Sequence, residues 1–192
     1  VYNLLELVRT KPNNVNRRPI FFQFSTDEVY GDIEKGEHTE DDLLNPSNPY
    51  SASKASADML VKAWARTYGL EYIILRPTNN YGSYQYPEKL VPLSVKLLQR
   101  DKKIRLHDEG KPVRNWLHAE DTASAVISII NSGKTNETYN VAGGFEQENR
   151  ETVRKIIEAY HGTDKDWAQY VDFGYKRLGQ DVRYALNDDK LR

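Results

Sequence analysis

The stretch FFQFSTDEVYG, residues 21–31, changes from apolar to polar halfway along. Its apolar half is a short continuous run, which is typical of a strand buried on both faces of a parallel sheet. Ser25, Thr26, Asp27 and Glu28 follow directly. Because ligands of open α/β sheets bind outside the carboxyl ends of strands, this junction is a candidate site. The alternative is an ordinary helix start, with Ser25 as N-cap and Glu28 completing a capping box.

Helical and strand patterns alternate on both sides of this stretch. A helical apolar pattern opens the chain at residues 1–8, and the strongest one runs over 50–69, where a glycine ends it. Further helices are expected at 88–101, 122–133 and 149–162, and further strands at 71–77, 103–106 and 138–143. The alternation predicts an α/β fold with a largely parallel, doubly wound sheet.

The composition narrows the class of protein. The chain has 192 residues, with 27 basic and 28 acidic side chains and no cysteine. The lack of cysteine excludes disulfides and thiol nucleophiles, and the near-zero net charge gives no sign of nucleic-acid binding. No apolar run approaches the roughly 20 residues that span a membrane. We therefore expect a soluble, intracellular protein with neither a membrane nor a nucleic-acid partner.

Tyr50 and Lys54 stand four residues apart at the start of the strongest helical pattern. This spacing places them on one helix face, where an ammonium group can approach the phenol. A nearby cation lowers a tyrosine pKa from about 10 and makes the side chain a usable base. The alternative is an exposed tyrosine and lysine on a helix surface, which the spacing alone favours.

Three motifs in a fixed order carry a family resemblance. STDEVYG, NPYSASKASAD and LRPTNNYG occur in this sequence as they do in extended short-chain dehydrogenase/reductases. The chain resembles most closely the nucleotide-sugar 4,6-dehydratases, above all those of the dTDP-glucose type. GKPVRNWLHAEDTA, TYNVAGG and RLGQDVRYALNDDK extend the likeness over essentially the whole chain. The Asp27–Glu28 pair marks dehydratases, since epimerases and decarboxylases of the superfamily carry other residues there.

The resemblance implies a Rossmann-like fold and an organisation into two parts. Residues 1–82 would form the C-terminal part of the NAD-binding domain. Residues 83–192 would form mainly a smaller substrate-binding lobe, with 115–145 returning to the Rossmann sheet. The family's G-x-x-G-x-x-G fingerprint is absent from this sequence, so we expect it upstream, in roughly a hundred residues of the same fold. A cytoplasmic homodimer is also implied.

The same resemblance assigns roles in an NAD-dependent dehydration. Tyr50, assisted by Lys54, takes the C4 hydroxyl proton of the sugar, and Thr26 holds that hydroxyl. Glu28 removes the C5 proton and Asp27 protonates the departing C6 hydroxyl, giving a 4-keto-6-deoxy sugar. The implied cofactor-binding residues are Ser25, Tyr50, Lys54 and Asn80. The implied substrate-binding residues are Thr26, Asn79, Lys89, Leu90, His107, Arg114, Asn140, Arg177 and Gln180.

Several positions depart from the family pattern. His107 stands where tyrosine is usual, and Leu178, Gln180 and Val182 replace proline, histidine and arginine in the tail motif. These changes leave the nucleotide base and the exact sugar open. The alternatives are another NAD-dependent epimerase or decarboxylase of the superfamily, or a non-catalytic fragment. Because the four histidines have no ligand-like spacing, we expect no metal site.

Overall fold

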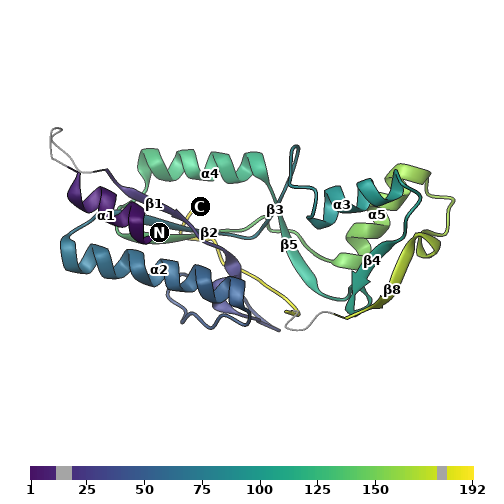
Figure 1. Cartoon of the computed structure of the whole chain (residues 1–192), viewed down its shortest axis with the longest axis horizontal. Coiled ribbons are helices and arrows are strands. Elements are labelled where there is room, and N and C mark those ends of the chain that lie inside the picture. The colour runs from purple at the N-terminus through teal and green to yellow at the C-terminus, as the bar shows by residue number, and fades with distance from the viewer. Residues whose placement is uncertain (12–18, 177–180) are drawn as a thin grey trace.

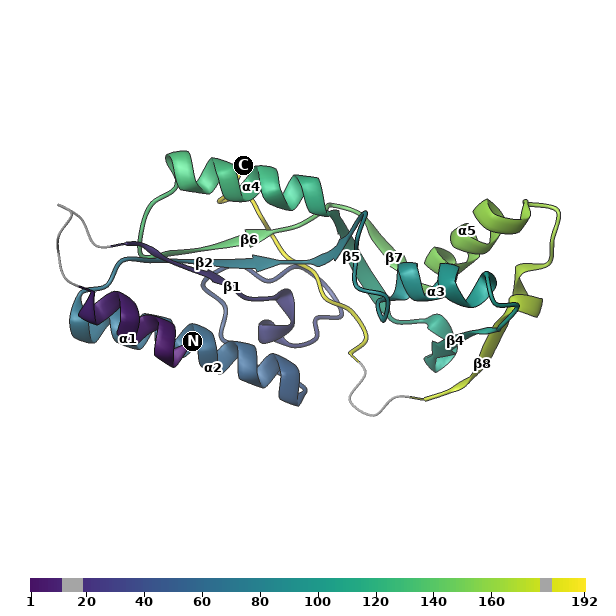
Figure 2. The same ribbon diagram turned by 45° about the horizontal axis from the view of Figure 1, so that its top comes forward.

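The computed structural model describes residues 1–11, 19–176 and 181–192, and it shows an elongated molecule with two regions side by side (Figure 1). The first, which we call the sheet region, has three layers. Its parallel sheet has the strand order β1-β2-β6. Helices α1 and α2 cover one face and α4 covers the other (Figure 2). The bounds are α1 Tyr2–Thr10, β1 Phe21–Phe24, α2 Pro49–Tyr68, β2 Tyr72–Pro77, α4 Ala119–Ser132 and β6 Glu137–Val141.

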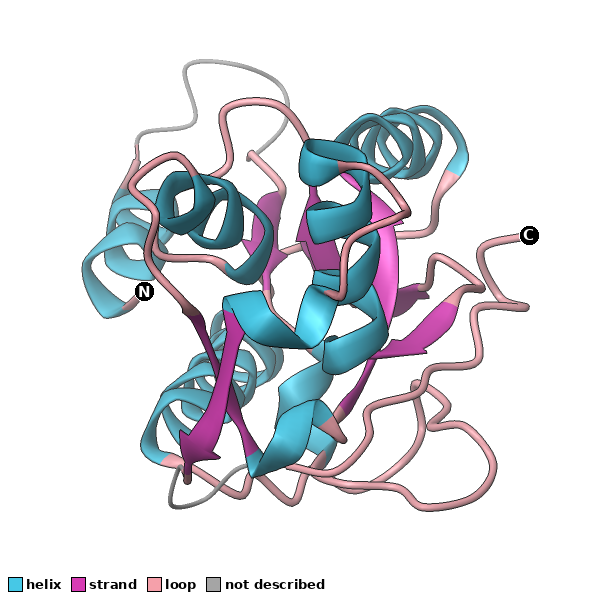
Figure 3. Ribbon diagram, turned by 90° about the vertical axis from the view of Figure 1, so that its right-hand side faces the viewer, coloured by secondary structure: helices cyan, strands magenta, loops and turns pink. Residues whose placement is uncertain are grey.

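The second region, which we call the α3–α5 region, packs two helices against two parallel strands (Figure 3). Its bounds are α3 Leu90–Leu98, β4 Ile104–His107, α5 Asn149–His161 and β8 Val171–Tyr175. Three short strands form a separate sheet between the two regions, in the order β3-β5-β7. Their bounds are β3 Asn79–Tyr81, β5 Val113–His118 and β7 Glu146–Glu148.

The expected α/β class with a parallel sheet is confirmed, as are the main helices and the strands of the sheet region. Residues 115–145 contribute α4 and β6 to the sheet region, while most of β5 lies in the middle sheet. The strands β3, β5 and β7 were not predicted. Among the described residues, no helix is long and apolar enough to cross a membrane.

The start of α2 is fixed by the side chain of Asn48. Its Oδ1 accepts a hydrogen bond from the backbone N–H of Ser51, and the Ser51 side chain pairs with the Asn48 backbone in return. Pro49 follows at the first helical position, where its fixed φ suits the helix and its missing N–H costs nothing. Gly69 ends the helix in the left-handed conformation, with φ of 67°. These caps set where Tyr50 emerges.

Residues 181–187 cross from the middle sheet to the sheet region. Their backbone carbonyls accept hydrogen bonds from the N–H groups of Ile33, His38 and Val113, at 2.8–3.2 Å. The segment therefore joins the loop after β1 to strand β5.

Candidate active site

The acidic pair lies in a single 3-10 turn, η1 (Asp27–Tyr30), directly after β1. Thr26 is the N-cap of this turn, and its Oγ1 accepts from the backbone N–H of Glu28 at 3.4 Å. The capping box with Ser25 as N-cap is therefore wrong. Ser25 instead continues the β1 ladder and donates its hydroxyl to Asp58 Oδ2 at 3.0 Å.

Asp27 is almost completely buried, with 3% of its surface exposed. Its Oδ1 accepts from the hydroxyl of Thr26 at 3.0 Å, and its Oδ2 is buried with no hydrogen-bond partner. Burial raises the pKa of Asp27 to about 7, and the neighbouring Glu28 carboxylate adds to the shift. A carboxyl of this kind holds a proton near neutrality and is able to donate it.

Tyr50 faces the same space from the first turn of α2 and is 54% exposed. Burial raises its pKa, followed by the carboxylates of Glu28 and Asp27, whereas a hydrogen bond with Thr26 opposes the rise. Lys54 donates its ammonium to the Phe24 carbonyl at 2.6 Å. The expectation that Lys54 lowers the pKa of Tyr50 is therefore wrong for this arrangement, because burial and then the two carboxylates raise that pKa.

A cavity of about 580 Å³ lies between the two regions, a size that suits a small-molecule ligand. It gathers predicted residues from the segment after β1 and from η1, α2, β3, β4, β5 and the start of α3. These are Ser25, Thr26, Asp27, Glu28, Tyr50, Asn79, Asn80, Lys89, Leu90, His107 and Arg114. The lining residues that were not predicted are Pro77, Thr78, Gln85, Tyr86, Glu88, Leu93, Arg105, Trp116 and Asn149. Lys54 does not line the cavity, and Arg177 and Gln180 lie outside the described residues.

Arg114 brings a cation to the cavity wall. Its guanidinium donates to the carbonyls of Val113 and Asp181, at 2.7 and 3.2 Å, and lies 4.9 Å from the ring centroid of Tyr184. Only 9% of Arg114 is exposed, so its side chain is held in one position. His107 reaches the cavity from the end of β4, and its Nδ1 is buried without a partner.

Asn140 does not reach the cavity, so its prediction as a substrate-binding residue is wrong. Its side chain is completely buried in the sheet region. Its Nδ2 donates to the carbonyls of His38 and Asn187, and its Oδ1 accepts from the hydroxyl of Tyr30. These contacts satisfy the amide within the fold, where it fastens β6 to the loop after η1.

A buried polar network under the acidic turn was missed by the sequence reasoning. Asp58 of α2 accepts from both Ser25 and Arg76, each at 3.0 Å, and Arg76 also donates to the Tyr30 hydroxyl at 2.7 Å. Asp58 and Arg76 are both buried, with 0% and 1% exposed. The signal was the lone arginine in the apolar run YIILRP, since a buried cation requires a partner. The network ties α2, β1, β2 and η1 together.

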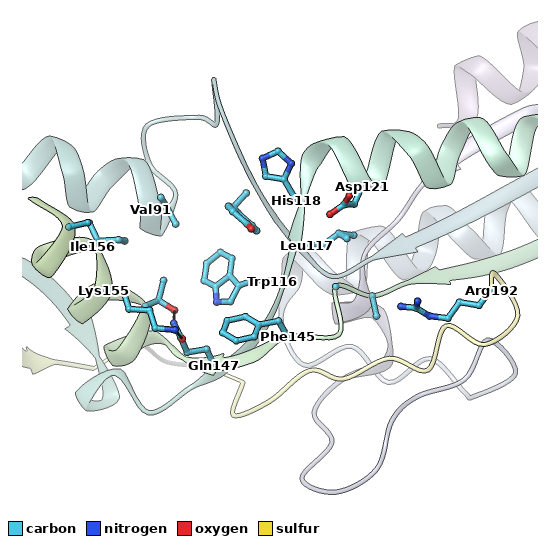
Figure 4. A pocket seen from close by; sticks show the side chains of 15 residues that line it. Val91, Trp116, Leu117, His118, Asp121, Phe145, Gln147, Lys155, Ile156 and Arg192 are labelled. Carbon is cyan, nitrogen blue, oxygen red and sulfur yellow. Dashed lines mark hydrogen bonds between the residues drawn. The ribbon is translucent and has the colours of Figure 1, made fainter.

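A second cavity of about 640 Å³ lies beside α4 and α5 (Figure 4). Trp116 and Phe145 present their rings to it, and Lys155 donates to Gln147 on its margin. None of the predicted site residues lines this cavity. Its lining is mainly apolar and has no neighbouring pair of carboxyl groups, so the chemistry suggested by the sequence belongs to the first cavity.

An acidic pair at a strand end, facing a helix-start tyrosine over a parallel sheet, is the arrangement implied by the resemblance to extended short-chain dehydrogenase/reductases. Within that class, the chain belongs to the GDP-mannose 4,6-dehydratase family, whose profile matches residues 1–192.

Curated relatives and solved structures agree with this assignment. The chain is 41% identical to dTDP-glucose 4,6-dehydratase of Neisseria meningitidis serogroup B, over all of this chain and 58% of the relative. It is also 41% identical to a low-salt glycan biosynthesis protein of Haloferax volcanii, over 90% of this chain and 54% of the relative. The crystal structure of dTDP-glucose 4,6-dehydratase from Bacillus anthracis in complex with NAD has a TM-score of 0.87 at 41% identity. It matches over 99% of this chain and 58% of that one. The chain thus spans little more than half the length of these relatives.

Proposed function

We propose that the protein to which this chain belongs is a hydro-lyase, a nucleotide-sugar 4,6-dehydratase that uses NAD and forms a 4-keto-6-deoxy sugar. One observation carries the proposal. Asp27 and Glu28 lie in one turn beside Tyr50, and burial raises the pKa of Asp27 to about 7. Elimination of water needs one carboxylate to remove a proton and one carboxylic acid to deliver one. Relatives named dTDP-glucose 4,6-dehydratase make a dTDP-glucose-like substrate our first choice.

The residues at the carboxyl end of β1 fit the nicotinamide end of a dinucleotide. The Lys54 ammonium, which carries three donors, is held at the carbonyl of Phe24, and Phe24 itself is 49% exposed. Ser25 and Tyr50 add hydroxyls, and Asn80 lines the cavity beyond them. We propose that these four side chains hold the cofactor. When bound, oxidised NAD would take a hydride from C4 and give the hydride back at C6.

The chain's own groups would then move the protons. Tyr50 accepts the C4 hydroxyl proton, and Thr26 holds that hydroxyl. The ketone formed at C4 makes the C5 proton acidic, and the Glu28 carboxylate removes it. Asp27, kept neutral by burial, protonates the C6 hydroxyl, which leaves as water. When C6 receives the hydride, the proton held by Glu28 would return to C5, which completes the 4-keto-6-deoxy sugar. Asn79, Lys89, Leu90, His107 and Arg114 would bind the nucleotide and sugar from the other walls of the cavity.

We also propose that the protein works as a homodimer through α1 and α2, in the cytoplasm, where nucleotide sugars and dinucleotides are available. Both helices lie on the same face of the sheet (Figure 2), and both expose large apolar side chains. These are Tyr2, Leu4 and Leu7 on α1, and Met59, Leu60 and Tyr68 on α2. Such a patch on neighbouring helices suits a four-helix interface. Light scattering on the full-length protein should give twice the chain mass, and a strict monomer would contradict the interface.

A product assay tests the proposed activity against its alternatives. The full-length protein, supplied with dTDP-glucose and NAD, should release a 4-keto-6-deoxy sugar with no net consumption of the cofactor. An epimerase would instead return an isomeric nucleotide hexose that keeps its C6 hydroxyl. A decarboxylase would release carbon dioxide from a nucleotide uronic acid. Mass spectrometry separates all three, because only dehydration removes the mass of one water from dTDP-glucose.

A further inference from the structure

Asn48 lies at a junction of three elements that the proposed chemistry does not account for. As the N-cap of α2, it uses Oδ1 to accept from the backbone N–H of Ser51 at 3.0 Å. Since that N–H is a donor, the amide oxygen must face the helix and the amide nitrogen must face away. The orientation of the Asn48 side chain is thus set by the helix itself.

The amide nitrogen of Asn48 points at two carboxylates from distant parts of the chain. Nδ2 lies 3.4 Å from Glu28 Oε2 in η1 and 3.3 Å from Asp181 Oδ2 in the 181–187 segment. A carboxylate only accepts hydrogen bonds, so both contacts agree with the orientation that the helix cap requires. One side chain therefore contacts the acidic turn, the start of α2 and the 181–187 segment.

The Asn48 donor matters because Glu28 lies close to other carboxylates. Asp27 is the preceding residue, and Asp181 shares the same amide nitrogen. The guanidinium of Arg114, which lines the same cavity, donates to the carbonyls of Val113 and Asp181. A neutral N–H donor between two carboxylates lets both remain close together without adding a charge to the cavity. It also restricts rotation of the Glu28 side chain.

We propose that Asn48 is a positioning residue, which fixes the Glu28 carboxylate relative to Tyr50. Tyr50 lies only two residues after Asn48, in the first turn of the helix that Asn48 caps. This inference rests on the proposed function, in which Glu28 removes the C5 proton. The donor end of the amide orients the base, and the acceptor end fixes the helix that carries the tyrosine. The groups that act at C4 and C5 are then held in fixed positions relative to each other by one side chain.

Asn48→Asp separates the two ends of this side chain. Aspartate has nearly the same shape and caps helices as well as asparagine, so α2 and Tyr50 stay in place. It has no N–H donor, and it adds a third carboxylate beside Glu28 and Asp181. Asn48→Ala removes both ends and serves as the variant in which the cap is also lost. Asp166→Asn, the reverse exchange at the remote N-cap of η3 (Trp167–Tyr170), is the matched control.

The full-length enzyme is assayed with dTDP-glucose for two readouts, formation of reduced cofactor in a single turnover and deuterium uptake at C5 from heavy water. Asn48→Asp should lower C5 exchange about tenfold or more while C4 oxidation stays within about threefold. Asn48→Ala should slow both steps, and Asp166→Asn should slow neither. Equal slowing of both steps by Asn48→Asp would show a merely structural role and overturn the proposal. An inactive wild type would instead refute the proposed function on which it rests.

Discussion

The sheet region and the α3–α5 region bury different kinds of side chain. The sheet region holds the ion pair of Asp58 and Arg76 in its interior, and it also buries the carboxyl of Asp27. The described part of the α3–α5 region buries no charged side chain, and its core is formed by aliphatic residues. These are Leu98, Ile104, Leu106, Val153, Ile157 and Val171.

This difference separates chemistry from recognition. Buried charges are costly unless they are paired and hydrogen-bonded, and they then hold their neighbours in fixed positions. The groups proposed to move protons lie next to such a buried, hydrogen-bonded network, at the end of β1 and the start of α2. The α3–α5 region contributes Lys89, His107 and Asn149 from the ends of elements that pack around this aliphatic core. Its side chains are therefore suited to selecting a ligand. Substitutions there should change the affinity for the ligand more than the turnover rate.

Tyr50→Phe should have the largest effect, and this effect should be on the turnover rate and not on the stability of the fold. Phenylalanine keeps the ring but has no proton to exchange, so we expect turnover to drop by about a thousandfold or more. Because Tyr50 is 54% exposed, the melting temperature should change little. Single-turnover formation of reduced cofactor measures the first step, and circular dichroism measures the fold. Near-normal turnover would remove Tyr50 from the mechanism.

Glu28→Gln and Asp27→Asn should each lower turnover by about a hundred- to a thousandfold, but at different steps. Glu28→Gln should allow C4 oxidation and block C5 exchange, so reduced cofactor accumulates. Asp27→Asn should leave C5 exchange comparatively fast and slow the loss of water. Deuterium uptake at C5, followed beside the absorbance of the reduced cofactor, distinguishes the two variants. Equal loss of the first oxidation in both would show that the pair positions substrate instead.

The difference in stability between Asp27→Asn and the wild type should depend on pH, because Asp27 is buried. Burial raises the pKa of Asp27 to about 7, so the folded protein retains a proton that the unfolded chain has lost. Stability of the wild type should therefore fall as pH rises from about 4 to about 7 and then level off. Asparagine removes this cost, so the variant should gain roughly 2–4 kcal/mol at pH 8 and almost nothing at pH 4. Urea titrations at the two pH values measure it, and a gain independent of pH would contradict the burial argument.

Arg154→Ala should have the smallest effect, because it removes partly exposed ion pairs of the α3–α5 region and no buried one. Its guanidinium pairs with Glu151 and Glu158 on the surface of α5, at 2.8 and 2.9 Å. Partly exposed pairs of this spacing are worth little, so the free energy of unfolding should change by less than about 0.5 kcal/mol. Chemical denaturation measures it. A loss of several kcal/mol would show that the α3–α5 region also depends on its charges.

Local sequence patterns were sufficient for the elements that carry the chemistry. Tyr50 and the Asp27–Glu28 pair each follow a strongly patterned boundary, and such boundaries meet at one edge of a parallel sheet. The strands β3, β5 and β7 have three to six residues, without alternation or an apolar run, so pairing across the sheet alone defines them. Long-range register also decided the role of Asn140, which pairs with Arg76 in the β2–β6 ladder. No local pattern reports which residues become neighbours in that way.

The position of residues 181–187 along the chain has a consequence for the order in which the molecule is built. The guanidinium of Arg183 donates to the carbonyls of Ile33 and Gly36, which are synthesised 150 and 147 residues earlier. At ribosomal rates, that gap corresponds to roughly 8 to 30 seconds. The loop behind the acidic turn thus emerges long before its partner, while β1, α2 and β2 are close enough in sequence to associate early. In refolding followed by amide exchange, protection at Ile33 and His38 should appear after protection in β2.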